Sequence, residues 1–503
     1  MTDLKGKTEP NRWAVLALLG VAQLMVTLDV TIVNIALPTA QQTLHFSTDQ
    51  RQWVITAYAL SFGSLLLLGG KLGDVFGRKW TFIGGLIGFA LASALGGMAG
   101  SFGTLVAARA LQGVFAALLA PTALSLLAVA FQDSPDRPKA LGIFGAIAAA
   151  GASLGLLLGG VITELLNWRW CLFVNLFIAV PAALVALHLI RNVRPQTRPR
   201  IDFPGVLVAS AGLFSLVYGL SSAETHSWSA PVTIVALIAN AVLLSAFVVL
   251  ENHVANPLLP LHIVWNRVRA GSYATMFIIG SGIFAQYLFL SFYMQKDLGF
   301  SPIETGLGFL PFTVTVAFTS IRAQKTILPR IGVKWLIMIG SALAVVGQVL
   351  FTRLSPHGNY ASEIVPSLIL TGLGVGCLFS SAIFGGTVSV KPGDAGIAGA
   401  LVNTSLQIGG SVGTTVLSLV FASSVAGYEA SHAASKSLAQ DAAIHGYTAA
   451  FWWAAGLFAL GVLVATFIIP KRTATPVSQP TAPGPQRHTP AFAAEAADVV
   501  DDS

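Results

Sequence analysis

Long apolar runs recur along the chain, and short segments that carry charge separate them. A helix that crosses the hydrocarbon core of a bilayer needs about 20 mainly apolar residues, so each run of this length predicts a membrane-spanning helix. Fourteen runs qualify, at residues 13–37, 53–72, 80–100, 104–127, 140–163, 170–190, 204–222, 231–250, 270–294, 303–325, 334–353, 363–389, 396–425 and 449–470. We therefore expect an all-α membrane protein.

The composition indicates that lipid solvates most of the chain. Of 503 residues, 54% are apolar and 10% are Asp, Glu, Lys or Arg, whereas a soluble domain carries about 25% of these charged residues. Cys171 and Cys377 lie within apolar runs, which argues against a disulfide framework or a zinc site, and we expect no metal. The net charge of +7 does not predict nucleic-acid binding, because the basic residues fall in short segments between the runs.

The positions of the basic residues predict the topology. With the N-terminus in the cytoplasm, 22 of the 28 Lys and Arg fall in cytoplasmic segments, five fall outside, and Arg109 lies within a span. The positive-inside rule requires such an asymmetry, which predicts both termini in the cytoplasm. We expect a multi-pass protein of the bacterial plasma membrane, in contact with membrane lipids.

The spans divide into groups of six, two and six. Short tails and a long insertion accompany these groups. The expected divisions are a cytoplasmic N-terminal tail at 1–12, a six-helix bundle at 13–190, a basic loop with an inserted hairpin (about 204–250) and a linker at 191–269, a second six-helix bundle at 270–470, and a disordered cytoplasmic tail at 471–503.

Several local motifs point to one family. Residues 70–79 read GKLGDVFGRK, residues 109–113 read RALQG, and residues 151–160 read GASLGLLLGG. Residues 28–38 (LDVTIVNIALP) and 168–175 (WRWCLFVN) add to them. Together the motifs resemble those of the major facilitator superfamily, and with the predicted spans they look like its fourteen-helix drug:proton antiporter branch, the EmrB/QacA type.

The resemblance implies a major facilitator fold with an inserted hairpin between two six-helix bundles. It implies export of amphipathic or hydrophobic organic compounds, such as drugs, toxic cations or antibiotics, in exchange for protons by alternating access. The expected partners are a small-molecule substrate and protons, with no cofactor and a functional monomer. An exporter dedicated to one metabolite or lipid would use the same coupling. We find no Walker-type nucleotide loop and no His-Glu metal motif, so we do not expect an enzyme.

Asp29 is the only acidic residue that we place well inside a span. An ionised carboxylate there is costly, so it is expected to face a cavity, pair with a cation or carry a proton. At 1.5 Å per residue, Asp29 lies about 12 Å and Arg109 about 8 Å from the outer ends of their helices, which allows them to pair. Such a pair either exchanges protons, with Asp29 alternating between an arginine-bound carboxylate and a neutral acid, or locks two helices together.

The loop between the second and third spans is a candidate cytoplasmic gate. Its glycines allow a tight turn and close helix approach, and its acid could cap a helix of the other bundle, which we expect to begin near Gly332. The alternative is that its basic residues only enforce topology. The gate residues are Gly70, Gly73, Asp74, Gly77, Arg78 and Lys79.

Glycines on the fifth span repeat every four residues, which permits close helix packing for either gating or ordinary stability. They are Gly151, Gly155 and Gly159, with Gly160 adjacent. The family motif usually has proline after the central glycine, but this chain has Leu156, which leaves a helix kink in doubt.

Polar residues near these motifs either line a substrate cavity or form interhelical hydrogen bonds. The candidates are Thr31, Asn34, Tyr58, Gln112, Gln286, Asn403 and Gln407. Aromatic residues within 284–293 and 309–312 offer either packing or a surface for hydrophobic ligands.

Overall fold

The described part of the chain folds almost entirely into helix, as expected. The computed structural model describes residues 11–46, 48–132, 134–191, 202–225, 227–254, 257, 259, 261–356, 358–388, 390, 394–433 and 437–470. Within these ranges the regular elements are all helical. The all-α class is therefore confirmed for the part of the chain described.

Six long helices form the first group. They are α1 (Arg12–Leu44), α2 (Thr48–Phe76), α3 (Arg78–Gly97), α4 (Phe102–Ala130), α5 (Arg137–Leu165) and α6 (Trp170–Leu189). A hairpin of α7 (Phe203–Thr225) and α8 (Pro231–Glu251) follows, and then the short α9 (Leu261–Val264).

The remaining helices form the second group, in which π-helical turns interrupt some of the α-helices. The α-helices are α10 (Arg267–Phe292), α11 (Pro302–Gly308), α12 (Leu310–Arg322), α13 (Leu328–Phe351), α14 (Val365–Thr387), α15 (Ala395–Ser431) and α16 (Leu438–Phe467). The π-turns are η1 (Tyr293–Asp297), η2 (Ala323–Ile327) and η3 (Tyr360–Ile364).

Among the described residues, 12 helices are long and apolar enough to cross a membrane, whereas the sequence predicts fourteen spans. One of the 12, Ile303–Phe351, is counted as a single stretch of 49 residues. At 1.5 Å per residue this stretch is more than twice as long as the hydrocarbon core is thick, and Gly332 (φ 79°) breaks its helical geometry. The α5 helix is continuous, but some of its side chains lie outside the described set. The count of fourteen stays a prediction.

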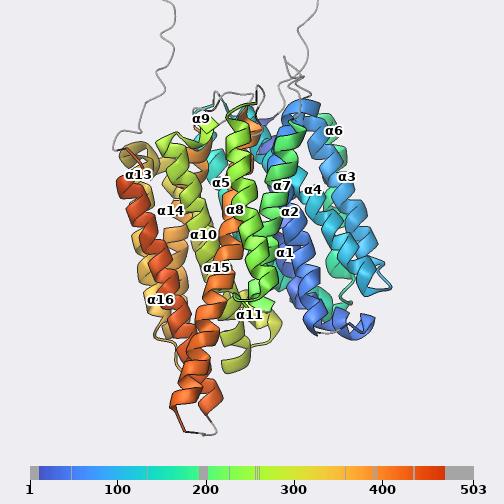
Figure 1. The fold of residues 1–503 in the computed structure, drawn as a ribbon. Coiled ribbons are helices and arrows are strands. Elements are labelled where there is room, and N and C mark those ends of the chain that lie inside the picture. The colour runs from blue at the N-terminus through green and yellow to red at the C-terminus, as the bar shows by residue number, and fades with distance from the viewer. Residues whose placement is uncertain are drawn as a thin grey trace, which may run out of the picture.

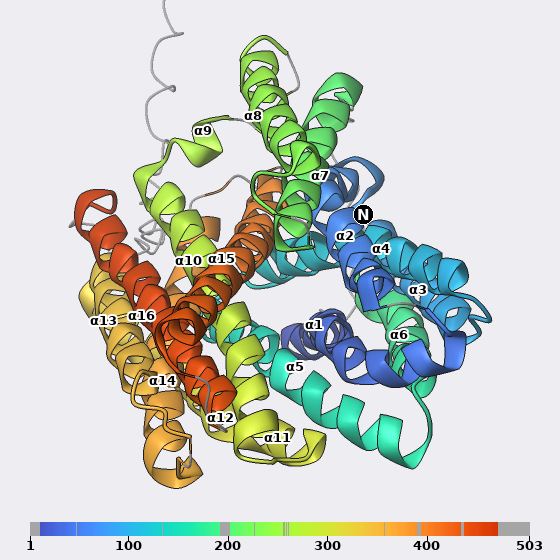
Figure 2. The same cartoon turned by 60° about the horizontal axis from the view of Figure 1, so that its bottom comes forward.

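The two groups repeat one packing pattern (Figure 2). In the first, α1 packs on α5 and α6, α2 on α4, and α3 on α4 and α6. In the second, α10 packs on α15 and α16, α12 on α14, and α13 on α14 and α16. The groups meet where α5 contacts α12 and α14 and where α15 contacts α2 and α4. The α7–α8 hairpin lies at the periphery against α2 and α15.

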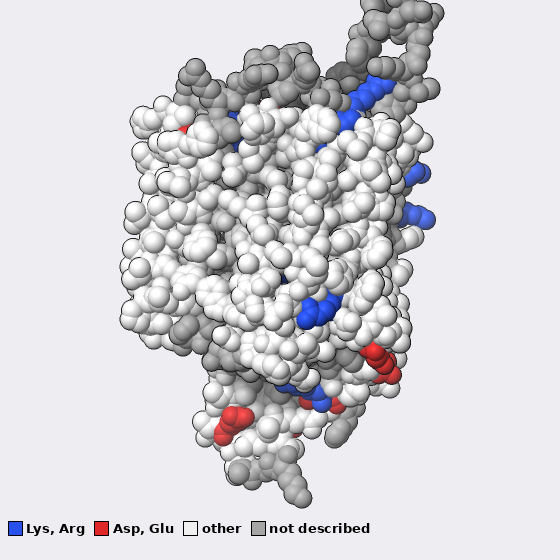
Figure 3. Space-filling model, turned by 90° about the vertical axis from the view of Figure 1, so that its right-hand side faces the viewer, with Lys and Arg blue, Asp and Glu red and all other residues white. Residues whose placement is uncertain are grey.

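The surface suits a lipid environment. One face of the molecule is largely uncharged, and its acidic side chains appear only near the two ends (Figure 3). Large apolar side chains remain exposed along α8, including Val235, Ile238 and Val242. At one end α15 and α16 extend beyond the other helices (Figure 1), so much of the expected outer loop at 426–446 is helical.

The glycines of α5 bring its backbone close to α1. A methyl group added at Gly151 would lie 2.7 Å from Thr27 Cβ, and one added at Gly159 would lie 2.9 Å from the Ile32 carbonyl oxygen. Gly155 faces Leu28 and Thr31 in the same way, and Gly160 is buried. The only proline of α5 is Pro138 in its first turn, so no proline interrupts the helix near Leu156. The glycine repeat therefore sets the α1–α5 distance.

Gly155→Ala is expected to lower thermal stability, because the added methyl would contact the Thr31 hydroxyl and lie 2.7 Å from the Leu28 carbonyl oxygen. Overpacking of this kind costs about 1–3 kcal/mol. The matched control is Gly84→Ala on α3, where a methyl meets nothing within 4 Å. It should leave the unfolding temperature unchanged or raise it slightly, because alanine favours helix over glycine. Thermal unfolding in detergent micelles measures both, and equal shifts would speak against close α1–α5 packing.

Candidate functional site

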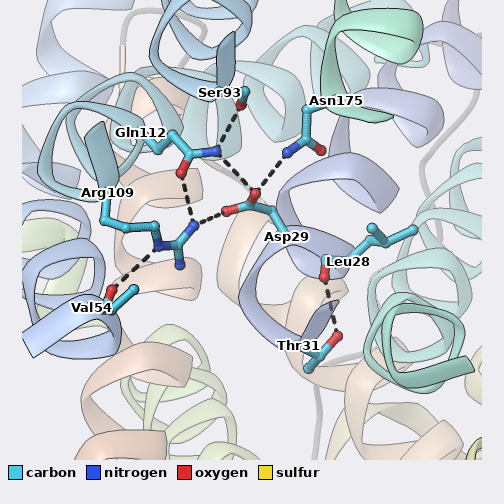
Figure 4. Close-up of polar contacts among 8 residues, drawn as sticks. All are labelled: Leu28, Asp29, Thr31, Val54, Ser93, Arg109, Gln112 and Asn175. Atoms are coloured by element: carbon cyan, nitrogen blue, oxygen red, sulfur yellow. Dashed lines mark hydrogen bonds and ion pairs between the residues drawn. The ribbon is translucent and has the colours of Figure 1, made fainter. Parts of the chain in front are cut away.

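A buried ion pair lies within the first helix group. The Asp29 side chain, on α1, has no exposed surface, and Arg109, on α4, is 2% exposed. Arg109 Nη1 donates to Asp29 Oδ2 at 2.6 Å. Gln112 Nε2 and Asn175 Nδ2 donate to Asp29 Oδ1 at 3.0 and 2.7 Å (Figure 4). Three donors from α4 and α6 therefore stabilise the carboxylate, as a charge buried away from water requires.

Arg109 has further partners that do not depend on Asp29. Its Nε donates to the Val54 carbonyl oxygen at 3.3 Å, and its Nη1 also donates to Gln112 Oε1 at 2.9 Å. The guanidinium lies 4.4 Å from the centre of the Tyr58 ring, a cation–π contact. These contacts with α2 and α4 would hold the arginine in place if Asp29 were neutral. The arginine therefore has partners on α2 and α4 besides the carboxylate.

A separate cavity of about 60 Å³ lies between the two helix groups. Its walls combine aromatic, aliphatic and neutral polar side chains. They are Gln23, Val26, Thr27, Val30, Thr31, Phe62, Ala148, Ile283, Phe284, Tyr287, Phe312, Phe379, Asn403, Leu406 and Gln407. Ligand pockets usually measure about 300–1,000 Å³, so the walls must separate to admit a compound of drug size.

The ion pair and the cavity lie on opposite faces of α1. Successive helical residues are rotated by about 100°, so Thr27 and Thr31, each two positions from Asp29, are turned about 200° from it. Figure 4 shows Asp29 pointing toward Arg109, while Thr31 points the other way. Both threonines line the cavity. The α1 helix therefore separates the charged network from the cavity and contacts both.

The polar candidates divide between these environments. Thr31, Asn403 and Gln407 line the cavity. Tyr58 and Gln112 instead contact Arg109, and Gln286 accepts a 2.7 Å hydrogen bond from Gln348, so these three are not among the cavity-lining residues.

All three contact another helix, which is the alternative that the sequence left open: Gln112 donates to Asp29 on α1, Tyr58 lies against Arg109 on α4, and Gln286 pairs with Gln348 on α13. The side chain of Asn34 lies outside the described set.

Some contributors are not predicted from the sequence. Ser93 accepts a 2.7 Å hydrogen bond from Gln112 Nε2, and Asn175 holds the carboxylate, while Gln23 and Thr27 line the cavity. Asn175 is the last residue of the 168–175 motif, and its position in that motif could have indicated a role in the site. Gln23 and Thr27 share a face with Thr31 at four-residue spacing, a helical periodicity that could have indicated them.

The candidate gate contacts a different helix from the one expected. A methyl added at Gly396, in the first turn of α15, would lie 2.6 Å from Asp74 Oδ2, and one at Gly70 would lie 2.9 Å from Ala400 Cβ. The expected partner of Asp74, the helix that begins near Gly332, is therefore wrong, since Asp74 lies against the N-terminus of α15. Arg78 Nη2 lies 2.9 Å from Asp74 Oδ1 within the same group.

The rest of the loop shapes the turn between α2 and α3. Gly77 has φ 94°, a left-handed conformation that favours glycine, and precedes the first turn of α3. Gly73 lies against Thr122, and Lys79 Nζ donates to the Leu187 carbonyl oxygen at 2.6 Å. These contacts stay within the first group, so Gly70 and Asp74 are the gate residues that we place against the second.

Comparison with known proteins gives consistent matches. The family model of the Major Facilitator Superfamily matches residues 19–414. The puromycin resistance protein pur8 of Streptomyces alboniger is 43% identical over 92% of this chain and 93% of its own length. The cephamycin export protein CmcT of Amycolatopsis lactamdurans is 35% identical over 85% of this chain and 90% of its own length. The crystal structure of the human organic anion transporter MFSD10 (TETRAN) covers 91% of this chain and 100% of its own, with a TM-score of 0.61 and 16% identity, and so shares the fold.

Asp74→Asn is expected to weaken the contact between the two groups at this end, because a carboxylate at a helix N-terminus contributes about 0.3–2 kcal/mol. A loss of that size shifts a balanced equilibrium by up to about thirtyfold. Spin labels at the exposed positions Phe76 and Trp265 should report longer distances in this variant than in the wild type.

The matched control is Asp136→Asn, which removes an exposed charge at the N-terminus of α5. It should leave the distance distribution unchanged. Identical distributions in wild type and Asp74→Asn would leave the loop with only a role in topology.

Proposed function

The chain belongs to the major facilitator superfamily, and we propose that it exports amphipathic or hydrophobic organic compounds in exchange for protons. Relatives that align along most of its length are named for antibiotic resistance or export, which supports a compound of that class. The chain is thus a multi-pass membrane protein, and membership of this family indicates a transporter rather than an enzyme. We place it in the bacterial plasma membrane, among membrane lipids.

The observation that carries the proposal is the buried Asp29–Arg109 pair. Ionisable residues inside membrane spans mark proton or substrate pathways by default. When Asp29 binds a proton, its attraction to Arg109 falls, while Arg109 keeps its contacts with Val54, Gln112 and Tyr58. Protonation would then loosen α1 from α4 and α6 without leaving an unpaired arginine.

Movement of α1 can reach the substrate because its other face lines the cavity. Close packing on the α5 glycines makes α1 and α5 shift together, and α5 also contacts α12 and α14 of the second group. We propose that proton binding at Asp29 favours closure of the two groups at one end of the molecule and that proton release favours closure at the other end. The energy source is the proton gradient, so no cofactor is needed, and a monomer contains the complete pathway.

The two groups contact each other near both ends of the molecule. Alternating access requires such contacts, because a gate at each end must be able to close. Toward one end, Gly70 and Asp74 lie against α15, and Ser320 Oγ donates to the Gly142 carbonyl oxygen at 3.0 Å. Toward the other, a methyl at Gly306 would lie 2.8 Å from Leu157 Cα. Opening one set of contacts while the other stays closed would expose the cavity to one side at a time.

A dedicated exporter of a single compound is the second candidate. It is favoured because pur8 and CmcT are each named for one antibiotic or antibiotic class. Efflux of a panel of unrelated amphipathic compounds separates the two, since a dedicated exporter would transport one chemical group only.

Asp29→Asn is expected to abolish uphill export driven by a proton gradient in proteoliposomes, because the amide keeps the size of the carboxyl group but binds no proton. Loss of the 2.6 Å ion pair removes the coupling and leaves the cavity side chains in place, so compound binding should survive.

The matched control is Glu164→Gln at the exposed end of α5, which also neutralises one acid and should export like the wild type. Full uphill export by Asp29→Asn would rule out Asp29 as the coupling residue.

A further inference from the structure

The cavity between the helix groups is neutral. No Asp, Glu, Lys or Arg is among the lining residues that the structure describes. Aromatic rings face it from both groups, with Phe62 on α2, Phe284 and Tyr287 on α10, Phe312 on α12 and Phe379 on α14. Such walls suit a planar apolar ligand, and they offer no charge to neutralise a cation.

Asp29 does not supply the missing charge. It lies on the opposite face of α1 and already accepts hydrogen bonds from Arg109, Gln112 and Asn175. A cation in the cavity would therefore be separated from Asp29 by the α1 backbone. Burial of an unpaired charge costs far more than burial of a neutral polar group, so the cavity favours uncharged compounds.

Gln23 on α1 presents an unsatisfied acceptor in the cavity wall. The Thr27 hydroxyl donates to the Gln23 main-chain carbonyl oxygen at 2.8 Å, which uses its only hydrogen. The Gln23 side-chain atom 3.3 Å from that hydroxyl must therefore be the donor, Nε2. Gln23 Oε1 is then left buried and without a hydrogen-bond partner among the described residues, on a residue that is 7% exposed.

Asn403 on α15 has its amide orientation determined in the same way. Its Nδ2 lies 3.1 Å from the Gly399 carbonyl oxygen, which can only accept, so the amide nitrogen must face that carbonyl. The amide oxygen Oδ1 is the remaining polar atom of a residue that lines the cavity. Each helix group thus contributes an amide side chain to a cavity whose remaining walls are aromatic, aliphatic and neutral polar.

We propose that Gln23 is a specificity-determining residue that selects uncharged aromatic compounds carrying an N–H or O–H donor. This inference rests on the proposed export function and narrows its substrate class. A donor on the compound satisfies Gln23 Oε1, whereas a compound without one leaves a buried acceptor unpaired. Asn403 offers a second acceptor from the opposite group, so a bound compound would connect the two groups.

Three tricyclic probes of nearly equal shape separate the effect of charge on binding affinity from the effect of a hydrogen-bond donor. Acridone is uncharged and has one ring N–H, N-methylacridone is uncharged and lacks it, and the N-methylacridinium ion is permanently cationic. Binding to the purified full-length protein in lipid nanodiscs is measured by probe fluorescence. We expect acridone to bind about tenfold or more tightly than N-methylacridone, the usual effect of an unpaired buried acceptor. N-methylacridinium should bind more weakly than N-methylacridone.

Two substitutions assign the effect to Gln23. Gln23→Leu removes the acceptor and should abolish the difference in affinity between acridone and N-methylacridone. Gln23→Glu adds a carboxylate to the cavity wall and should raise the affinity for N-methylacridinium. The matched control is Gln132→Leu at an exposed position after α4, which should change no affinity. If Gln23→Leu fails to fold, the order of the three probe affinities in the wild type and the affinity of Gln23→Glu for N-methylacridinium still test the inference.

Several outcomes overturn the inference. One is binding of N-methylacridinium to the wild type that is as tight as that of N-methylacridone or tighter. Another is an equal loss of affinity for both neutral probes in Gln23→Leu, and a third is that no probe binds. Transport in proteoliposomes separates this failure from that of the export function. If the protein exports N-methylacridinium in preference to the neutral probes and the proton gradient drives this export, only the selection of neutral compounds is overturned. If the probes bind in the expected order but the proton gradient drives export of none of them, only the export function is overturned.

Discussion

A carboxylate buried in a helical interior is the constraint on which the account depends. Asp29 has no exposed surface, and its charge is stable there only because Arg109, Gln112 and Asn175 donate to it. These donors tie α1 to α4 and α6. We propose that a proton on Asp29 replaces part of that stabilisation and so changes how firmly α1 is held. The other face of α1 lines the cavity, so in this proposal the same helix connects proton binding with the substrate.

The second helix group repeats the packing of the first but not its charge. By position in that pattern, α10 and α13 correspond to α1 and α3. They are joined by a neutral hydrogen bond, from Gln348 Nε2 to Gln286 Oε1 at 2.7 Å. An amide pair stabilises helix contacts without exchanging protons. Proton coupling is therefore expected to reside in the first group, while both groups supply aromatic walls and amide oxygens to the cavity.

The features that the sequence predicted best are those with few possible partners. Asp29 and Arg109 carry opposite charges inside spans, and a charge buried there requires a partner of opposite charge. Neutral residues such as Tyr58, Gln112 and Gln286 have many possible partners, so the sequence could not decide between cavity lining and contacts between helices. The 100° rotation per residue separates Asp29 from Thr31 and could have been applied beforehand. The contact of Asp74 with α15 depends on how the two groups meet, which helix periodicity does not encode.

The central claim is that Asp29 takes up the coupled proton. Infrared difference spectroscopy on the protein in lipid vesicles tests it directly, because the C=O stretch of a protonated carboxylic acid lies at a higher frequency than the bands of a carboxylate or an amide. The account predicts that the carboxylic acid band that grows as the pH is lowered is more intense in the wild type than in Asp29→Asn, by the contribution of one carboxyl group. A band of equal intensity in both proteins would mean that another group binds the proton, and would contradict the account.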